Sequence, residues 1–157
     1  MDATFLSLRA SRRQLLRAAG ALGLVSILPA ARACEFFCSS LRVYKPYARE
    51  TLAGDTSVIV GMTLDEVVQD DRLIGVTSPL ATSAELGGVG AGPSGIDLPI
   101  RRGQVLVLHE DTTYIRLLGL KQPLGLGREY PLTLHFEKAG VVDADIDVSY
   151  TRNQSIK

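Results

Sequence analysis

The strictest constraint in this sequence is a regular alternation of apolar and polar residues from position 142 to position 150. Because successive side chains of an extended chain point to opposite faces, this alternation predicts a β-strand with one buried and one solvated face. From residue 41 onward, no stretch keeps apolar residues at helical spacing for three turns. The apolar face of the strand comprises Val142, Ala144, Ile146, Val148 and Tyr150, and the polar face comprises Asp143, Asp145, Asp147 and Ser149.

Other stretches of the chain show the same alternation or form short apolar runs bounded by turn residues. Such runs are typical of short β-strands. About seven or eight of them over about 110 residues fit a sandwich of two sheets, so the fold class is predicted to be all-β. The expected strands lie at 41–47, 57–64, 72–77, 104–108, 113–120, 130–136 and 142–150, and 96–100 is expected to be an extended segment.

The N-terminus has the pattern of a bacterial export signal. Residues 11–17 read SRRQLLR, a twin-arginine signature, and an apolar run at 18–30 and the small-residue pattern Ala-Arg-Ala at 31–33 follow it. We therefore expect residues 1–33 to be a signal peptide that directs the chain to the periplasm. The apolar run is shorter than the ~20 residues that a membrane-spanning helix needs, so the mature protein is expected to have no membrane span.

The formal charge of zero hides an asymmetry between this leader and the rest of the chain. Residues 1–33 contain five arginines and a single acidic residue, Asp2. Without them the chain has 12 basic and 16 acidic residues, a net charge of −4. Nucleic-acid binding requires a basic surface, and that class of function is not expected.

The two cysteines, Cys34 and Cys38, directly follow the predicted cleavage site in a short segment at 34–40. An oxidising compartment favours a local disulfide between them. The same pair is suited to binding a soft metal such as Cu(I) or to thiol redox chemistry. A third interpretation is a lipid anchor on Cys34, although Arg32 is an unfavourable neighbour for a lipoprotein cleavage site. All three interpretations remain open at this point.

Two further patterns resemble functional motifs without completing them. The glycine-rich segment 87–95 contains G-x-G-x-x-G at 90–95, but an extended segment follows where a dinucleotide site needs a helix. Asp143, Asp145 and Asp147 have the spacing of a calcium loop without its glycine and glutamate. No hydrolase signature occurs, and no enzymatic activity is expected.

The two histidines are expected to be structural or surface residues. His109 lies at the end of a predicted strand, and His135 lies within one. His109, Glu110 and Asp111 together could form no more than a weak metal patch.

Five motifs spread over nearly the whole mature chain share the pattern of one known family. They are LRVYKPYAR at 41–49, DRLIGVTSPLA at 71–81, GLKQPL at 119–124, PLTL at 131–134 and FEKAG at 136–140. Together they resemble the periplasmic copper chaperones called PCuAC. The resemblance implies a cupredoxin-like β-sandwich at 41–150, followed by a polar tail at 151–157. It also implies Cu(I) bound by His and Met and delivered towards cytochrome oxidase assembly.

The family's copper-ligand positions are occupied by other residues in this chain. Aligned on the Gly-Leu-Lys motif at 119–121, the family's His-x-Met falls on Tyr114 and Arg116. Aligned on Ser-Pro at 78–79, the first family His falls on Gly87, and no Met follows Met62 to supply the remaining ligand. A guanidinium does not give up its proton to coordinate a metal, so copper is not expected at these positions.

The expected function is therefore copper handling in the periplasm, with Cys34 and Cys38 as the candidate Cu(I) ligands. Its partner would be a copper-acceptor or assembly-factor protein. The alternative is a module that has lost the copper site and recognises a partner without metal. A thiol-redox protein using the two cysteines is a further alternative.

Overall fold

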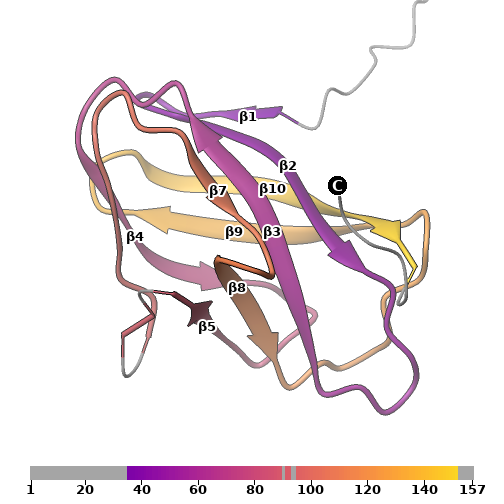
Figure 1. Ribbon diagram of the computed structural model, residues 1–157. Helices are drawn as coiled ribbons and strands as arrows, with labels where there is room; N and C mark the ends of the chain where they lie inside the picture. Colours follow the sequence, from indigo (N-terminus) through magenta and orange to yellow (C-terminus); the bar gives the residue numbers. More distant parts are fainter. Residues whose placement is uncertain (1–34, 90, 93–94, 152–157) are drawn as a thin grey trace, which may run out of the picture. The chain divides into compact units, whose positions relative to one another are not determined.

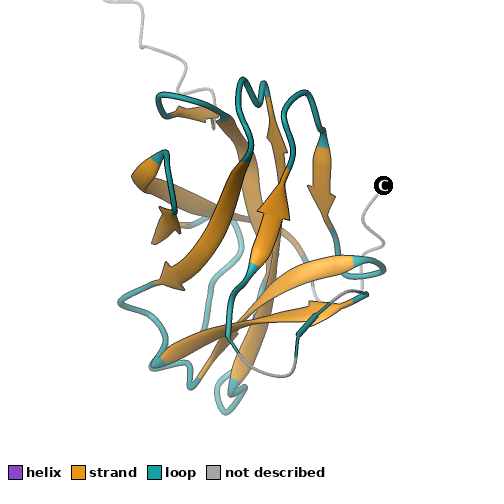
Figure 2. Ribbon diagram, turned by 90° about the vertical axis from the view of Figure 1, so that its left-hand side faces the viewer, coloured by secondary structure: helices purple, strands orange, loops and turns teal. Residues whose placement is uncertain are grey.

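The computed structural model describes residues 35–89, 91–92 and 95–151, which all lie in one compact unit. These residues form ten β-strands and contain no helix, hence none that could cross a membrane (Figures 1 and 2). The all-β prediction is confirmed. The strands are β1 (Glu35–Phe37), β2 (Arg42–Arg49), β3 (Ser57–Asp65), β4 (Asp71–Thr77), β5 (Ser83–Gly88), β6 (Leu98–Ile100), β7 (Leu106–Leu108), β8 (Thr113–Leu118), β9 (Glu129–Phe136) and β10 (Gly140–Tyr150).

One continuous hydrogen-bonded path connects most of these strands, in the order β5-β8-β3-β2-β10-β9-β4-β6. β1 pairs with β2 and β7 pairs with β3 beside this path. The β2–β10 pair is parallel, and every other pair is antiparallel. The sheet curls at the parallel pair, so that β9 and β10 run across β2 and β3 (Figure 1).

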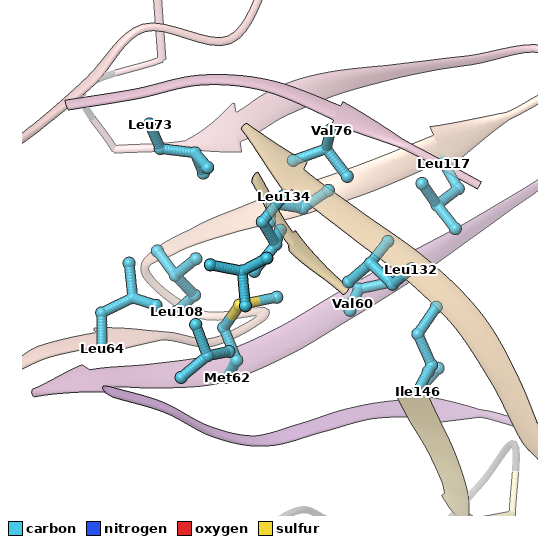
Figure 3. Packing of buried hydrophobic residues seen from close by; sticks show 14 of the residues in the cluster. Val60, Met62, Leu64, Leu73, Val76, Leu108, Leu117, Leu132, Leu134 and Ile146 are labelled. Atoms are coloured by element: carbon cyan, nitrogen blue, oxygen red, sulfur yellow. The ribbon is translucent and has the colours of Figure 1, made fainter. Parts of the chain in front are cut away.

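The hydrophobic core fills the space between the two halves of this curled sheet (Figure 3). Because inward-facing side chains alternate with outward-facing ones along each strand, both halves contribute an apolar layer. The predicted apolar face of β10 is buried from Val142 to Val148. Among the buried residues, Val60, Met62, Leu64, Leu108 and Leu117 come from one half, and Leu73, Val76, Leu132, Leu134 and Ile146 from the other.

Two strands were not predicted from the sequence. β5 contains one buried apolar residue, Leu86, and ends at Gly87 and Gly88, which begin the glycine-rich segment 87–95. β1 lies in the segment 34–40 that was set apart from the sandwich, and it pairs with the first half of β2. Pro46 lies at an irregularity of β2: the pairing of β2 with β3 shifts register there, and Lys45 has a φ of 46°.

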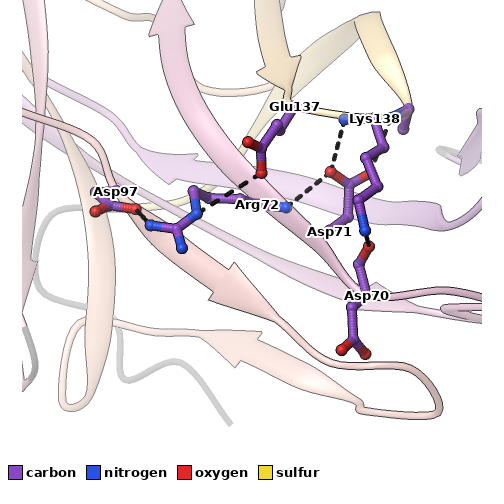
Figure 4. Close-up of polar contacts among 7 residues, drawn as sticks. Asp70, Asp71, Arg72, Asp97, Glu137 and Lys138 are labelled. Carbon is purple, nitrogen blue, oxygen red and sulfur yellow. Dashed lines mark hydrogen bonds and ion pairs between the residues drawn. The ribbon is translucent and has the colours of Figure 1, made fainter.

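The carboxylate of Asp71, the first residue of β4, holds the turn between β9 and β10 (Figure 4). Its Oδ1 accepts hydrogen bonds from the backbone N–H of Arg72 at 2.7 Å and of Lys138 at 2.9 Å. Its Oδ2 accepts one from the N–H of Ala139 at 2.9 Å. Asp71 is only 6% exposed, so these bonds satisfy N–H groups that water does not reach freely.

A second connection joins two of the sequence motifs on the other side of the domain. The backbone N–H of Lys121 donates to the carbonyl oxygen of Leu80 at 2.8 Å, and its Nζ donates to that of Pro79 at 3.0 Å. Gly119 has a φ of 64°, a left-handed conformation that favours glycine. The Gly-Leu-Lys motif is therefore needed to connect β8 to the segment after β4.

Replacing Asp71 with Asn should destabilise the protein. Burial by itself would raise the pKa of Asp71, but the three backbone N–H groups outweigh it and hold the pKa below its ordinary value. The charged carboxylate therefore stabilises the fold above the unfolded pKa of about 3.9, and this contribution is lost as the pH falls through the folded pKa. We expect a loss of about 1–3 kcal/mol in unfolding free energy at pH 7. Urea denaturation at pH 7 and at lower pH measures it.

The matched control for this variant is Asp143→Asn, on the exposed face of β10, where the carboxylate accepts a bond from Thr133 Oγ1. It should change the unfolding free energy little at either pH. If the unfolding free energy of Asp71→Asn falls with decreasing pH as much as that of the unmodified protein, the buried carboxylate does not cause this pH dependence.

Candidate functional site

The structure brings together the three residues at the family's copper-ligand positions. Gly87 lies on β5, and Tyr114 and Arg116 lie on the neighbouring strand β8. The antiparallel register places Gly87 opposite Tyr114 and Glu85 opposite Arg116. Tyr114 and Arg116 alternate with inward-facing residues of β8, so they share the outer face of the sheet.

Arg116 contacts both Tyr114 and Glu85, and we call the three residues the Tyr-Arg-Glu cluster. Nη2 of Arg116 donates a hydrogen bond to the Tyr114 hydroxyl oxygen at 2.7 Å. Nη1 lies 3.4 Å from Oε1 of Glu85. The guanidinium carbon is 5.3 Å from the centroid of the Tyr114 ring, within cation–π range. A permanent positive charge thus lies where the resemblance implied a metal cation.

The Tyr114 ring lies directly over Gly87. A Cβ atom added at Gly87 would be 2.3 Å from Cε2 of this ring, closer than real side chains approach. Gly61 on β3 has the same relation to Tyr47 on β2, with 2.3 Å between the added Cβ and Cζ. A histidine at position 87 therefore requires Tyr114 to move.

Beside the cluster, a groove of about 450 Å³ opens on the outer face of β2, β3 and β8. Arg49 on one side of it makes a two-pronged ion pair with Glu110, with Nη2–Oε1 at 2.6 Å and Nε–Oε2 at 3.1 Å. This pair raises the pKa of Arg49 and lowers that of Glu110, so both are ionised. Burial raises the pKa of Tyr47. The lining residues are Tyr47, Arg49, Glu50, Thr51, Gly54, Asp55, Thr56, Ser57, Val58, Ile59, Glu110 and Arg116.

Local contacts engage both histidines. Nδ1 of His109 accepts a hydrogen bond from the backbone N–H of Asp111 at 3.3 Å. Nε2 of His135 lies 3.3 Å from Oγ1 of Thr77. Within the described ranges, no three His, Cys, Asp or Glu side chains are grouped so that they could hold a metal ion.

Of the two cysteines, Cys34 lies outside the described residues. Cys38 follows β1, is half-buried against the core, and its thiol donates to the carbonyl oxygen of Leu41 at 3.2 Å. It is a free thiol. Glu35–Phe37 forms an extended strand, whereas a shared metal site between the cysteines would be served by a helical turn or tight loop. The cysteine site stays a prediction.

The sequence analysis missed Glu85 as a partner of Arg116 and missed the groove. Glu85 lies two residues before Gly87 and hence on the same face of β5. That relation is visible in the sequence only once 83–88 is known to be a strand. The groove depends on the register of β2, β3 and β8, which no local pattern reveals.

Replacing Tyr114 with His and Arg116 with Met in one variant should not produce a tight copper site. The two restored side chains lie on one strand, and position 87 offers no further ligand, so Cu(I) remains under-coordinated. A Cu(I) competition titration against the unmodified protein measures this. A large gain in affinity in the double variant would mean that the outer face of β5 and β8 supplies donors other than the family's.

Comparisons with known proteins agree with this architecture. The sequence pattern of the family described as "Putative lipoprotein LpqE-like" matches residues 41–148. Among curated proteins none matches the chain. Three solved structures are similar in fold, with identities of 22–24%.

The first is a copper-bound PCuAC domain from PmoF2, with 23% identity and a TM-score of 0.67, covering 74% of this chain and 97% of that one. The second is an apo PCuAC domain from PmoF1, with 24% identity and a TM-score of 0.67, covering 74% and 98%. The third is apo-DR1885 from Deinococcus radiodurans, with 22% identity and a TM-score of 0.60, covering 99% and 97%. The predicted cupredoxin-like fold is therefore confirmed.

Proposed function

Because this chain belongs to the LpqE-like family, we propose that it works in copper handling in the periplasm, where it helps to deliver copper towards cytochrome oxidase assembly. The shared fold supports this role: PCuAC domains have the same architecture, and the PmoF2 domain contains copper. The twin-arginine pattern at 11–17 supports export. The role involves no catalysis, and the partner is a copper-acceptor or assembly-factor protein.

In this proposal copper does not bind at the outer face of β5 and β8. The Arg116 guanidinium is a cation with no lone pair to offer a metal, and it repels a second cation nearby. Its neighbours, a phenol and a carboxylate, are hard donors that Cu(I) disfavours. The thiolates of Cys34 and Cys38 are softer than any other donor that remains after export, and they are the proposed ligands.

A second candidate function is recognition of a partner without any metal. The Tyr-Arg-Glu cluster favours it, because the positions that would hold copper are occupied by side chains that contact one another. An arginine with a planar fork of donors is frequent in protein recognition sites. The sandwich would then serve as the recognition surface.

Cu(I) titration of the reduced protein separates these two functions. Under the first, the protein binds Cu(I), and a variant with Cys34 and Cys38 both changed to Ser loses that affinity. The matched control is Met62→Leu, which removes the remaining thioether; Met62 is 1% exposed in the core and should not contribute. Equal affinity in the serine variant would rule out the cysteines, and absence of binding in all proteins would favour the second candidate.

Export by the twin-arginine route is tested by changing Arg12 and Arg13 to Lys. We expect the precursor to accumulate in the cytoplasm and the periplasmic fraction to fall strongly, since the route requires the arginine pair. Cell fractionation with immunoblotting measures both pools. An undiminished periplasmic pool would contradict this route.

A further inference from the structure

The groove beside Arg116 has the dimensions of a small-molecule site. Its volume of about 450 Å³ falls within the range of roughly 300–1,000 Å³ that is usual for ligand pockets. Tyr47 of β2, Ile59 of β3 and Arg116 of β8 contribute from three adjacent strands. These strand residues are held by sheet pairing, whereas other lining residues come from loops, namely Glu50, Thr51, Gly54, Asp55, Thr56 and Glu110.

Arg116 differs from the two arginines with which it can be compared. Arg42 binds Asp65 through two bonds of 2.8 and 2.7 Å, and Arg49 binds Glu110 through bonds of 3.1 and 2.6 Å. Arg116 has a single carboxylate contact, at 3.4 Å, which is longer than a charge-assisted hydrogen bond usually is. Its charge is the least neutralised of the three.

Two groups outside the groove hold the Arg116 side chain. Tyr114 and Glu85 each accept from one of its terminal nitrogens, and neither residue lines the groove. A guanidinium has five N–H donors, so three of them have no partner among the described residues. A fork of fixed, unused donors at a groove matches the two oxygens of a carboxylate.

An apolar surface lies next to this fork. Ile59 is the cross-strand neighbour of Arg116. The Tyr47 ring covers Gly61 and meets the Tyr150 ring edge-on, with centroids 5.4 Å apart. These contacts fix Tyr47, so the groove presents a rigid apolar wall beside a positive charge.

The other charges of the groove disfavour a ligand more strongly the more negative charge it carries. Glu110 neutralises Arg49, and Asp55 accepts a bond from the backbone N–H of Leu52 at 2.8 Å. With Glu50, three carboxylates line the groove against two guanidiniums. This excess of negative charge opposes a dianion more strongly than a monoanion, so a single carboxylate paired with Arg116 is the anion that the groove disfavours least.

We propose that this groove binds a ligand with one carboxylate and an apolar body, the carboxylate on Arg116 and the body against Ile59 and Tyr47. Such a ligand is either a small organic acid or the carboxyl end of an apolar peptide. The proposal does not depend on copper, and its test uses protein free of metal.

The test is a titration of the purified protein with N-acetyl-leucine, followed by NMR chemical shifts. Saturable binding with shifts at residues of the groove is expected. N-acetyl-leucinamide, which lacks the charge, and inorganic phosphate, which carries more than one, should each bind roughly tenfold more weakly or not at all. An acetylated pentapeptide ending in leucine distinguishes the two kinds of ligand. If it binds more tightly than N-acetyl-leucine, the ligand is the carboxyl end of a peptide; if the two bind equally, the ligand is a small acid.

Variants test whether the carboxylate of the ligand binds to Arg116. Arg116→Gln should weaken N-acetyl-leucine by roughly tenfold or more, and Arg116→Lys, which keeps the charge but not the fork, should weaken it less. Glu85→Gln should bind as well or more tightly, because it removes the competing carboxylate. The matched control is Arg102→Gln, an exposed arginine outside the groove, which should not change affinity.

Several results would overturn the proposal. They are the absence of saturable binding to the unmodified protein, equal binding of the amide or of phosphate, and unchanged affinity in Arg116→Gln. Spectra of the free variants show whether each is folded. If Arg116→Gln does not fold, the other two variants test the proposal. Unchanged affinity in Arg116→Lys together with weaker binding in Glu85→Gln would contradict binding in the groove.

Discussion

The buried carboxylate of Asp71 is the interaction on which the rest of the sandwich depends. It accepts hydrogen bonds from three backbone N–H groups, and these belong to both β4 and the turn between β9 and β10. That turn sets the register of β9 against β10, and β10 pairs in parallel with β2. The two halves of the curled sheet meet at this parallel pair. A polar bond at the edge of the core therefore helps to fix how the apolar layers face each other.

The same interaction shows that residues of the sequence motifs stabilise the fold and do not by themselves indicate metal binding. The FEKAG motif at 136–140 contributes the turn, and DRL at 71–73 contributes the carboxylate that holds it. The Gly-Leu-Lys motif at 119–121 binds the backbone of Pro79 and Leu80 in a similar way. Residues that satisfy backbone groups in this way are needed by the fold whether or not a metal is bound. The motifs are therefore explained by the fold alone.

Most of the fold could be predicted from the sequence because most strands have one buried face. The alternation of β10 appears in the structure as predicted. β5 could not be predicted, since only Leu86 is buried and two glycines end the strand. β1 is three residues long, too short for any period to be recognised. The candidate site was predictable only in part: alignment on the motifs identified Gly87, Tyr114 and Arg116, whereas Glu85 and the groove follow from strand register.

The packing of Tyr114 over Gly87 couples the substitutions that are possible on the outer face of β5 and β8. Any side chain that appears at position 87 meets the ring, so a histidine there requires the Tyr114 side chain to move. Replacing the tyrosine first removes the hydroxyl that holds Arg116 and leaves the Gly87 backbone uncovered. Neither substitution is neutral alone, and the two positions are epistatic. A new ligand set at positions 87, 114 and 116 therefore requires coupled substitutions and not single, independent ones.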